Sequence, residues 1–476
     1  MCGFVGITGV EDAAALLSLG LQAVQHRGQD AAGIGVWNDG HVRVHKDEGM
    51  VTQAIPPAIV AEMKGTSGVG HVRYPTVGSG GRIDAQPFMT RRPTMILAHN
   101  GNVTNIPEVE ARLKARGIRL TSRCDAEPIL AVLGDELLRN SVVDYSEEDV
   151  VRAVAATFER VRGAYSVVFV LQVDGHETLV AFRDPHGVRP GVYGRNAEGA
   201  WAAVSETVSL DVLGFERVGD IPPGSVMLFR AGREPITRAV TPRPIRHCIF
   251  EDIYFARPDS IMEGRRVNGQ RWAFGTRLAD EWSAKGHSAD VVVAVPDTSR
   301  PAAEAMAERL GIPCREGFIK NRYSGRTFIM PTQAARDAAH RLKLNPIREV
   351  FEGKRVVMVD DSIVRGTTMR RIVQMVRSMG PTELHVAIFS PAVRHPCFYG
   401  IDMPSQDELV AARHDDATLE PALAERFGAD SVSFLSAAGL RQVAGKSICD
   451  ACFTGRYPIP VSDEERRHIQ FDRRGT

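Results

Sequence analysis

The sequence predicts two domains of different class, a layered α+β domain followed by an α/β domain. The first half is rich in short strand-like runs with only a few long helical patterns, whereas the second half alternates strands with helices. The 476 residues are enough for two or three domains. We place the first domain at residues 2–235 and the second, with a C-terminal extension, at residues 236–476. The proline-rich stretch 241–244 just after this boundary is typical of a stiff connector.

In the first half, short apolar runs bounded by turn residues predict strands, and longer periodic stretches predict helices. The predicted strands are Phe4–Thr8, Ala32–Trp37, Val42–His45, Thr94–His99, Ser166–Leu171, Thr178–Phe182 and Trp201–Ser205. The predicted helices are Ala13–Gln25, Ile106–Arg116, Glu127–Leu138 and Glu148–Val161.

In the second half, apolar strand runs lead directly into helical patterns. The predicted elements are the strand Val291–Val295, the helix Pro301–Leu310, the strand Arg355–Val359, the helix Met369–Met379 and the strand Leu384–Ser390. This alternation predicts a parallel sheet with ligand-binding loops at the carboxyl ends of its strands.

The composition is that of a globular protein without a charge bias. Hydrophobic residues make up 43% and charged residues 24%, and 58 basic residues balance 58 acidic ones, so nothing indicates a nucleic-acid partner. No apolar run approaches the roughly 18 residues of a membrane span, and Glu11 and Asp12 interrupt any signal-peptide core. We expect a cytoplasmic protein without a membrane partner, whose seven cysteines do not form disulfides.

Cys2 is a candidate nucleophile. If an aminopeptidase removes Met1, Cys2 carries both a thiol and a free α-amine. An α-amine has a pKa of roughly 7.7–8.0, so it can act as the base that generates the attacking thiolate. On its own, a cysteine here is more often just a small apolar side chain near a terminus, so its role depends on the rest of the sequence.

Polar residues cluster where the predicted strands of the first half end. In Asn100-Gly101-Asn102, a side-chain amide and a glycine N–H can together hold a developing oxyanion, although an isolated Asn-Gly is more often a tight turn. Arg73 can form a forked contact with a substrate carboxylate, and Asp125 can accept hydrogen bonds from an ammonium group. Taken singly, each of these charged residues is more often part of a surface ion pair.

Together these stretches resemble the class II glutamine amidotransferase domain, which has an N-terminal-nucleophile hydrolase fold. The resemblance implies that Cys2 attacks the side-chain amide of glutamine and that Asn100 and Gly101 form the oxyanion hole. It also implies that Arg73 holds the glutamine carboxylate and Asp125 the amine. The matching pieces are Met1-Cys2-Gly3, His26-Arg27-Gly28, Arg73-Tyr74-Pro75-Thr76, His99-Asn100-Gly101-Asn102 and Cys124-Asp125.

The loop after the strand Arg355–Val359 has the most informative chemistry of the second half. Two adjacent carboxylates, Asp360 and Asp361, suit the vicinal hydroxyls of a ribose or a hard cation. Hydroxyls and successive N–H groups at a helix start form a phosphate cradle, and the following residues fit that role: Ser362, Gly366, Thr367 and Thr368. A helix cap would explain the two acids but not the Gly-Thr-Thr, so the pattern predicts a ribose 5-phosphate site.

This pattern resembles the signature of the type I phosphoribosyltransferases, which bind phosphoribosyl pyrophosphate. The resemblance implies that Asp360 and Asp361 contact the ribose hydroxyls and help to hold Mg²⁺. It implies as well that residues 362–368, Arg365 included, hold the 5-phosphate. It also implies that the loop Asp297–Arg300 contacts pyrophosphate, with Thr298 as a metal contact. The segment Lys320–Thr327 would be a flexible lid in which Lys320 and Arg322 face the polyanion, although its cations alone are typical of a solvated loop.

Four of the cysteines are candidates for one metal site. Cys449 and Cys452 form a C-x-x-C step, and Cys248 and Cys397 would complete a set of four thiolates. Such a set suits zinc or an iron–sulfur cluster. Spacing does not choose between these, and buried free cysteines are a third possibility. Cys124 and Cys314 do not belong to this set of candidate ligands and are predicted to be core residues.

The two halves together resemble the amidophosphoribosyltransferase family, from Cys2 to about Pro458. The resemblance implies glutamine-dependent synthesis of 5-phosphoribosylamine from phosphoribosyl pyrophosphate, with internal transfer of ammonia, as the first step of de novo purine (IMP) synthesis. The surroundings of the four cysteines match the branch of the family with a [4Fe–4S] cluster, which favours the cluster over zinc. A homotetramer inhibited by purine nucleotides is also implied.

Two other classes of protein share part of this pattern. A regulator that senses phosphoribosyl pyrophosphate needs no glutaminase residues, and an amidotransferase that makes an amino sugar needs no Asp360-Asp361 motif. Two residues depart from the family pattern: Asp84, where Asn is more usual, and Asp252, which is more polar than expected. We expect neither to affect an assigned role.

Overall fold

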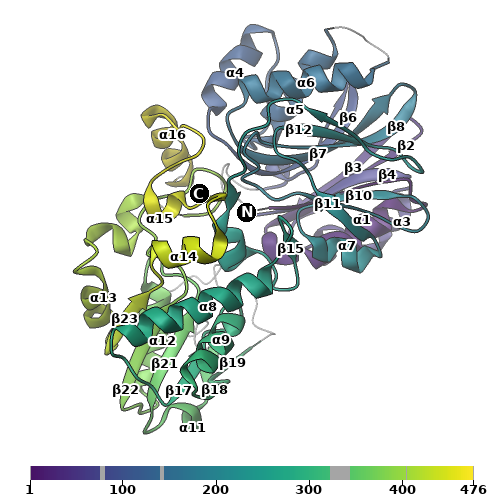
Figure 1. Ribbon diagram of the computed structural model, residues 1–476. Coiled ribbons are helices and arrows are strands. Elements are labelled where there is room, and N and C mark those ends of the chain that lie inside the picture. Colours follow the sequence, from purple (N-terminus) through teal and green to yellow (C-terminus); the bar gives the residue numbers. More distant parts are fainter. Residues whose placement is uncertain (1, 75–80, 140–143, 322–343, 404, 475–476) are drawn as a thin grey trace.

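The computed structural model describes residues 2–74, 81–139, 144–321, 344–403 and 405–474. Figure 1 shows two parts: the first half of the chain is built on two stacked sheets, and the second half on a single sheet flanked by helices. The helices at the C-terminal end, α14 (Ala437–Ala444), α15 (Ala451–Thr454) and α16 (Asp463–Arg474), lie beside the junction of the two parts.

The first half contains two antiparallel sheets. One has the strand order β11-β9-β10-β1-β4-β2-β3, and the other has the order β13-β12-β8-β7-β6-β5. The strands of the first sheet are β1 (Gly3–Thr8), β2 (Ala31–Asn38), β3 (His41–Glu48), β4 (Ser67–Arg73), β9 (Val192–Arg195), β10 (Trp201–Val204) and β11 (Glu216–Asp220). Those of the second are β5 (Phe88–Arg91), β6 (Thr94–Val103), β7 (Gly163–Val173), β8 (His176–Arg183), β12 (Ser225–Phe229) and β13 (Ile236–Ala239).

Helices cover the outer face of each sheet, which gives four layers. Successive side chains of a strand point to opposite faces, so in β1 Phe4 packs between the sheets while Val5 and Ile7 pack against α1. A Cβ on Gly6 would lie 2.9 Å from a methyl of Leu179, so the sheets pack closely at this point. The covering helices are α1 (Ala13–Ala23), α2 (Val51–Ala54), α3 (Pro57–Glu62) and α7 (Thr207–Leu213) on one side and α4 (Ile106–Ala115), α5 (Ala126–Leu137) and α6 (Glu147–Arg160) on the other.

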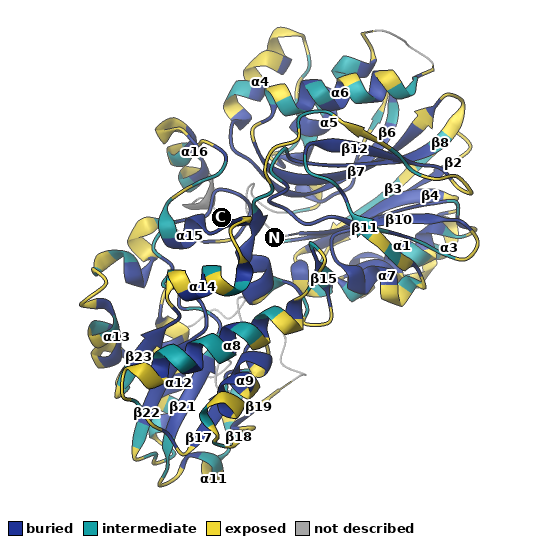
Figure 2. Ribbon diagram, viewed as in Figure 1, coloured by how far each residue is buried: buried dark blue, intermediate teal, exposed yellow. Residues whose placement is uncertain are grey.

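The second half is built on a parallel sheet with the strand order β18-β17-β21-β22-β23. Both faces are covered, so the middle of its central strands is mainly apolar. Val357 faces α8, α9 and α14, and Met358 faces α12 and α13. Its elements are α8 (Val267–Ala284), β17 (Val291–Ala294), α9 (Arg300–Leu310), β18 (Cys314–Arg315), β21 (Arg355–Asp360), α12 (Thr367–Arg377), β22 (Glu383–Ile388), α13 (Leu419–Phe427) and β23 (Ser431–Phe434). Figure 2 shows the buried strands of all three sheets beneath partly exposed helices.

Shorter elements complete the second half. They are the strands β14 (His247–Cys248), β15 (Ile261–Met262), β16 (Arg265–Arg266), β19 (Phe318–Lys320), β20 (Leu344–Pro346) and β24 (Ile448–Cys449) and the helix α11 (Arg348–Phe351). Among the described residues, no helix is both long and apolar enough to cross a membrane.

The predicted α+β and α/β classes are confirmed, and the predicted strands and helices all form, with ends that shift by a few residues. The sequence reading missed β4, whose glycines at 68 and 70 hide its apolar pattern. The predicted boundary after residue 235 falls within the first part, because β13 pairs with β12 as the edge strand of the second sheet. That sheet therefore extends to Ala239.

Candidate active sites

Cys2 lies immediately before β1, at the end of the two-sheet sandwich that faces the second half. Its side chain is largely buried, and its Sγ lies 3.7 Å from the main-chain oxygen of Tyr74. The main-chain nitrogen of Cys2 donates to Oδ1 of Asn100 at 3.4 Å. The nucleophile predicted from the sequence thus lies beside the predicted oxyanion residue, 98 positions away in the chain.

Asn100 and Gly101 lie near the end of β6 and are fully buried. The Nδ2 atom of Asn100 has no hydrogen-bond partner among the described residues. A buried donor without an acceptor is costly, and here it is available to an oxygen bound next to Cys2. A Cβ on Gly101 would lie 2.1 Å from the main-chain oxygen of Ala164, so only glycine fits.

Asp125 lies at the start of α5 and is held by β6. Its Oδ2 accepts from the N–H of Val103 at 3.0 Å and lies 3.3 Å from Nε2 of His99. The side-chain oxygen of Gln86 accepts from the main-chain N–H of His99, and Nε2 of Gln86 lies 3.1 Å from Nδ1 of His99. Since the amide nitrogen of Gln86 is a donor, Nδ1 of His99 is the acceptor and Nε2 of His99 carries the proton. Burial alone would raise the pKa of Asp125, but His99 and the N–H of Val103 lower it below its ordinary value. A negative carboxylate suits an ammonium ligand.

Arg73 ends β4 and is almost completely buried. Its Nη2 lies 3.7 Å from Oδ2 of Asp84, which is also buried and whose Oδ1 accepts from the N–H of Arg123 at 2.9 Å. Contrary to the expectation from the sequence, Asp84 thus lies beside a residue with a predicted role. An Asn there would remove a negative charge beside the arginine that is predicted to hold the glutamine carboxylate.

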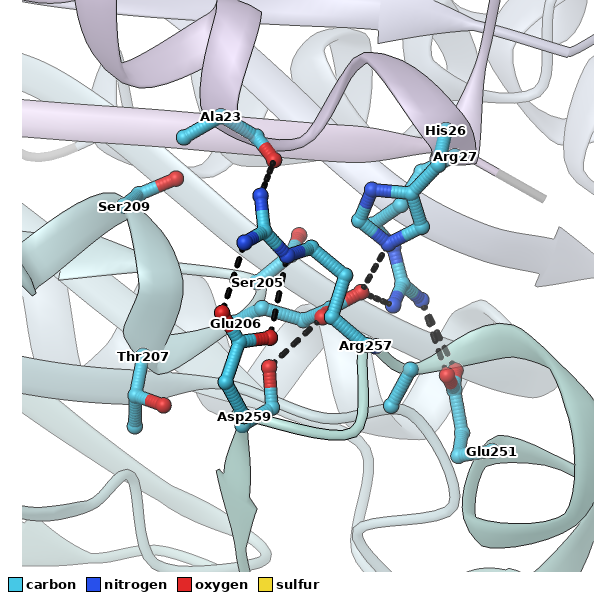
Figure 3. A network of polar contacts seen from close by, with 12 residues as sticks. Ala23, His26, Arg27, Ser205, Glu206, Thr207, Ser209, Glu251, Arg257 and Asp259 are labelled. Carbon is cyan, nitrogen blue, oxygen red and sulfur yellow. Dashed lines mark hydrogen bonds and ion pairs between the residues drawn. The ribbon is translucent and has the colours of Figure 1, made fainter. Parts of the chain in front are cut away.

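Arg27 joins Cys2 to the second half of the chain. Figure 3 shows its contacts with Glu206 and Glu251. Its Nε donates to the main-chain oxygen of Cys2 at 2.9 Å, its Nη1 pairs with Glu206, and its Nη2 donates to both oxygens of Glu251 at 2.8 and 3.1 Å. All three charged side chains are fully buried. Burial would lower the pKa of Arg27, but the two carboxylates raise it above its ordinary value.

Glu206 is the second centre of this network. It accepts from His26 at 2.8 Å, and its Oε2 accepts from the N–H of Arg257 at 3.0 Å and from the hydroxyl of Ser260 at 2.8 Å. Arg27 belongs to a motif that is visible in the sequence, but Glu206 and Glu251 were not predicted as site residues, because ion pairs between residues more than 170 positions apart leave no local pattern.

Asp360 ends β21, and Asp361 opens the loop that leads to α12. Burial and the neighbouring Asp361 raise the pKa of Asp360 well above its ordinary value. Burial also raises the pKa of Asp361 to about 6, opposed by the hydroxyl of Ser362, 2.6 Å away, and by Arg271. A bound cation would relieve the repulsion between two carboxylates held in one place.

Arg271, on α8, is a further residue of this site that the sequence reading missed. Its guanidinium donates to the main-chain oxygens of Asp252 at 2.9 Å and Ala256 at 2.7 Å. Burial lowers the pKa of Arg271 to about 10, although the negative charge of Asp361 opposes part of this decrease. Asp252 itself is buried beside Arg265, at 3.2 Å, so its unexpected polarity is compensated.

The predicted phosphate cradle lies between β21 and α12. Gly366 has φ +75°, and a Cβ there would lie 3.1 Å from the ring of Phe427, so the turn requires glycine. Thr367 and Thr368 form the exposed first turn of α12. Arg365 instead pairs with Glu408 at 2.9 Å.

The two remaining predicted parts of this site are only partly described. Thr298 lies in the loop between β17 and α9, half-buried. Lys320 ends β19. Its Nζ lies 2.5 Å from Oδ2 of Asp297, which belongs to the loop that carries Thr298. Arg322 and the rest of the predicted lid lie outside the described residues.

The four cysteines predicted to form one site come together. Cys248 of β14 and Cys449 of β24 are partners in a parallel strand pair, and all four line one pocket: Cys248, Cys397, Cys449 and Cys452. Arg189 also lines this pocket; burial lowers its pKa, but Cys248, Glu251 and Cys397 raise it above its ordinary value. Among the described residues, no three His, Cys, Asp or Glu side chains are placed to hold a single metal ion.

The two halves touch next to the glutaminase residues. Nδ2 of Asn102 donates to the main-chain oxygen of Phe398 at 2.9 Å, and the hydroxyl of Tyr74 donates to Asp402 at 3.0 Å. The strand that carries Asn100 therefore lies against the segment that follows Cys397.

This fold and these sites define the class of protein. A family model described as a glutamine amidotransferase domain matches residues 79–212, and one described as a phosphoribosyl transferase domain matches residues 272–396. The chain is thus a two-domain enzyme in which a glutamine amidotransferase precedes a phosphoribosyltransferase.

Relatives along the whole chain identify the family. The chain is 42% identical over 466 residues to an amidophosphoribosyltransferase of Synechococcus elongatus, covering 96% of this chain and 91% of the relative. It is 44% identical over 438 residues to one of Pseudomonas aeruginosa, covering 90% and 86%. The chain therefore belongs to the amidophosphoribosyltransferase family.

Solved structures agree with this assignment. The structure of a glutamine phosphoribosylpyrophosphate amidotransferase from Bacillus subtilis, complexed with ADP and GMP, has a TM-score of 0.86 and 37% identity, covering 97% of this chain and 98% of that one. A structure described as the allosteric regulatory enzyme of purine biosynthesis has a TM-score of 0.87 and 37% identity, covering 98% and 97%.

Proposed function

We propose that this chain transfers the amide nitrogen of glutamine to the anomeric carbon of phosphoribosyl pyrophosphate, releasing glutamate and pyrophosphate and forming 5-phosphoribosylamine. This is the first step of purine biosynthesis. The observation that carries the proposal is the contact of Cys2 with Asn100, whose buried Nδ2 has no partner among the described residues. The same chain holds an Asp360-Asp361 pair before a phosphate cradle.

In the first site, the α-amine of Cys2, exposed once Met1 is removed, takes the thiol proton. The thiolate adds to the amide carbon of glutamine, and Asn100 Nδ2 with the N–H of Gly101 holds the resulting oxyanion. Arg73 binds the glutamine carboxylate and Asp125 the ammonium group. The carbon–nitrogen bond breaks as the leaving nitrogen takes a proton from the α-ammonium of Cys2, and water then hydrolyses the thioester to glutamate.

In the second site, the lone pair of ammonia attacks the anomeric carbon as the bond to pyrophosphate breaks. Asp360 and Asp361 hold the ribose hydroxyls, and the residues 362–368 hold the 5-phosphate, so the reacting atoms are aligned. Mg²⁺, when held by the two aspartates and Thr298, would neutralise charge on the leaving pyrophosphate. The contacts Asn102–Phe398 and Tyr74–Asp402 bring the two halves together beside Cys2, which favours internal transfer of ammonia before water protonates it.

The activity is tested by measuring glutamate and pyrophosphate in one reaction with glutamine, phosphoribosyl pyrophosphate and Mg²⁺. The proposal predicts equal amounts of both products and no pyrophosphate when the nitrogen source is omitted. Glutamate formed without any pyrophosphate would contradict it.

We also propose that the four pocket cysteines hold a [4Fe–4S] cluster. A single zinc ion binds thiolates at roughly 2.3 Å and so needs all four sulfurs around one point, whereas a cluster binds each thiolate through a different iron. Four cysteines around one pocket match the four irons of such a cluster. The buried cation Arg189 would offset its negative charge.

Iron and sulfide analysis of protein purified without oxygen tests the cluster. We expect about four of each per chain and visible absorption, both lost in Cys397→Ser. The matched variant Cys314→Ser changes a cysteine outside the pocket and should keep both. A colourless protein with one zinc per chain would exclude the cluster.

Three further properties belong to this proposal because of the family resemblance. They are assembly as a homotetramer, inhibition by purine nucleotides and a cytoplasmic location. The Bacillus subtilis relative was crystallised with ADP and GMP, which supports nucleotide binding by this chain as well.

A further inference from the structure

A second pocket lies beside the cysteine pocket and is lined mainly by cations. Its volume is about 360 Å³, within the usual range for small-molecule sites. It lies where the end of α14, the strand β24 and the chain after α15 meet, and its charged lining residues are Arg246, Arg441, Lys446, Arg456 and Asp450.

The single carboxylate does not balance these cations. Oδ2 of Asp450 accepts from Nε and Nη2 of Arg441 at 2.9 and 2.5 Å, and its Oδ1 accepts from the hydroxyl of Thr454 at 3.1 Å. Asp450 is thus occupied by Arg441 and by its own helix α15. The remaining charge in the pocket is positive.

The other three cations face the pocket without a carboxylate among the described residues. The guanidinium of Arg246 donates to the main-chain oxygen of Ile245 at 3.1 Å, and Lys446 and Arg456 form no ion pair with any described residue. Like charges in one concavity repel each other, and such a site concentrates anions. Guanidinium groups bind phosphate oxygens in pairs, and an ammonium adds a point charge.

We propose that this pocket binds a small polyanion with a diphosphate group. Three uncommitted cations match the charge of a diphosphate, and the concave shape suits a small molecule rather than a flat protein surface. The pocket is distinct from the site at Asp360, because it is lined by residues around the C-x-x-C step. The same diphosphate chemistry is found in free pyrophosphate and at the end of a nucleoside diphosphate.

Calorimetric titration of the full-length protein with inorganic pyrophosphate, and separately with ADP, tests this site. Lys446→Glu/Arg456→Glu should weaken one binding event at least tenfold. The control Lys114→Glu/Arg119→Glu makes the same charge change on exposed residues around the end of α4 and should leave both titrations unchanged. Loss with pyrophosphate identifies the free anion as sufficient, and loss with ADP alone identifies the nucleotide.

The conservative variant Lys446→Arg/Arg456→Lys should retain binding, and glutamine-dependent activity reports that each variant is folded. If Lys446→Glu/Arg456→Glu gives the same titrations as the control Lys114→Glu/Arg119→Glu, with pyrophosphate and with ADP, the pocket is not a polyanion site.

Discussion

Arg27 and Glu251 form an ion pair between the first and second halves of the chain, in which Nη2 of Arg27 donates to both carboxylate oxygens, at 2.8 and 3.1 Å. Neither side chain is exposed. Since the same guanidinium donates to the main-chain oxygen of Cys2, the position of the nucleophile depends on a carboxylate of the other half.

We predict that Glu251→Gln lowers glutamine-dependent activity more than ammonia-dependent activity. Breaking a buried ion pair costs about 3–5 kcal/mol, so the unfolding midpoint in urea should fall as well. Glu234→Gln is the control, because Glu234 pairs with Arg195 on the surface, at 3.0 Å, where a pair is worth about 0–1 kcal/mol. Equal loss of both activities would show that Glu251 does not act through Cys2.

Glu206 should make stability depend on pH below about 4.3, the ordinary pKa of glutamate. Burial raises the pKa of Glu206, but Arg27, His26 and the N–H of Arg257 lower it well below that value. A carboxyl group whose folded pKa is depressed contributes stability above its unfolded pKa and loses it as the pH falls. Glu206→Gln should therefore lower the urea midpoint strongly at pH 7 and less at pH 3.5. A difference that does not shrink in acid would contradict this assignment.

Asn100→Ala should lower kcat for glutamine hydrolysis by about 10²–10³, the usual effect of removing one oxyanion donor. The ammonia-dependent reaction is the internal control, because it does not use the first site. A kcat for glutamine hydrolysis within threefold of the unsubstituted protein would show that the unpartnered Nδ2 has another role.

Asp361→Asn should lower the glutamine-dependent and ammonia-dependent reactions together, since both use the second site. Without Mg²⁺, it should also raise stability at neutral pH. Burial raises the pKa of Asp361 to about 6, above that of the unfolded chain, so the unsubstituted protein loses stability as the pH rises from about 4 to 6. Asp416→Asn, at an exposed position, is the control. If the urea midpoints of Asp361→Asn depend on pH in the same way as those of the unsubstituted protein, the raised pKa of Asp361 does not lower the stability of the folded protein.

Much of this account could be predicted from local sequence. The strand before Asp360 is apolar from Val356 to Val359, and acidic, hydroxyl and glycine residues follow it. Both the element and its ligand chemistry are therefore visible in one stretch. Cys2, Asn100 and Asp125 were found because each sits at a strand or helix end with a distinctive neighbour.

The long-range pairs could not be predicted in the same way. Arg27, Glu206 and Glu251 meet only because the sandwich places the start of β1 against the second half, and each is an ordinary charged residue in its own segment. Arg73 and Asp84 lie 11 positions apart in the sequence, and no local pattern predicts that they meet, so the contact of Asp84 with Arg73 was not expected.

The central claim is that Cys2 supplies nitrogen from glutamine to a separate site. It is tested most directly by pyrophosphate release from phosphoribosyl pyrophosphate by Cys2→Ala, measured with glutamine and then with an ammonium salt. The account predicts no release with glutamine and near-normal release with ammonia. Release with glutamine, or none with ammonia from a folded protein, would contradict it.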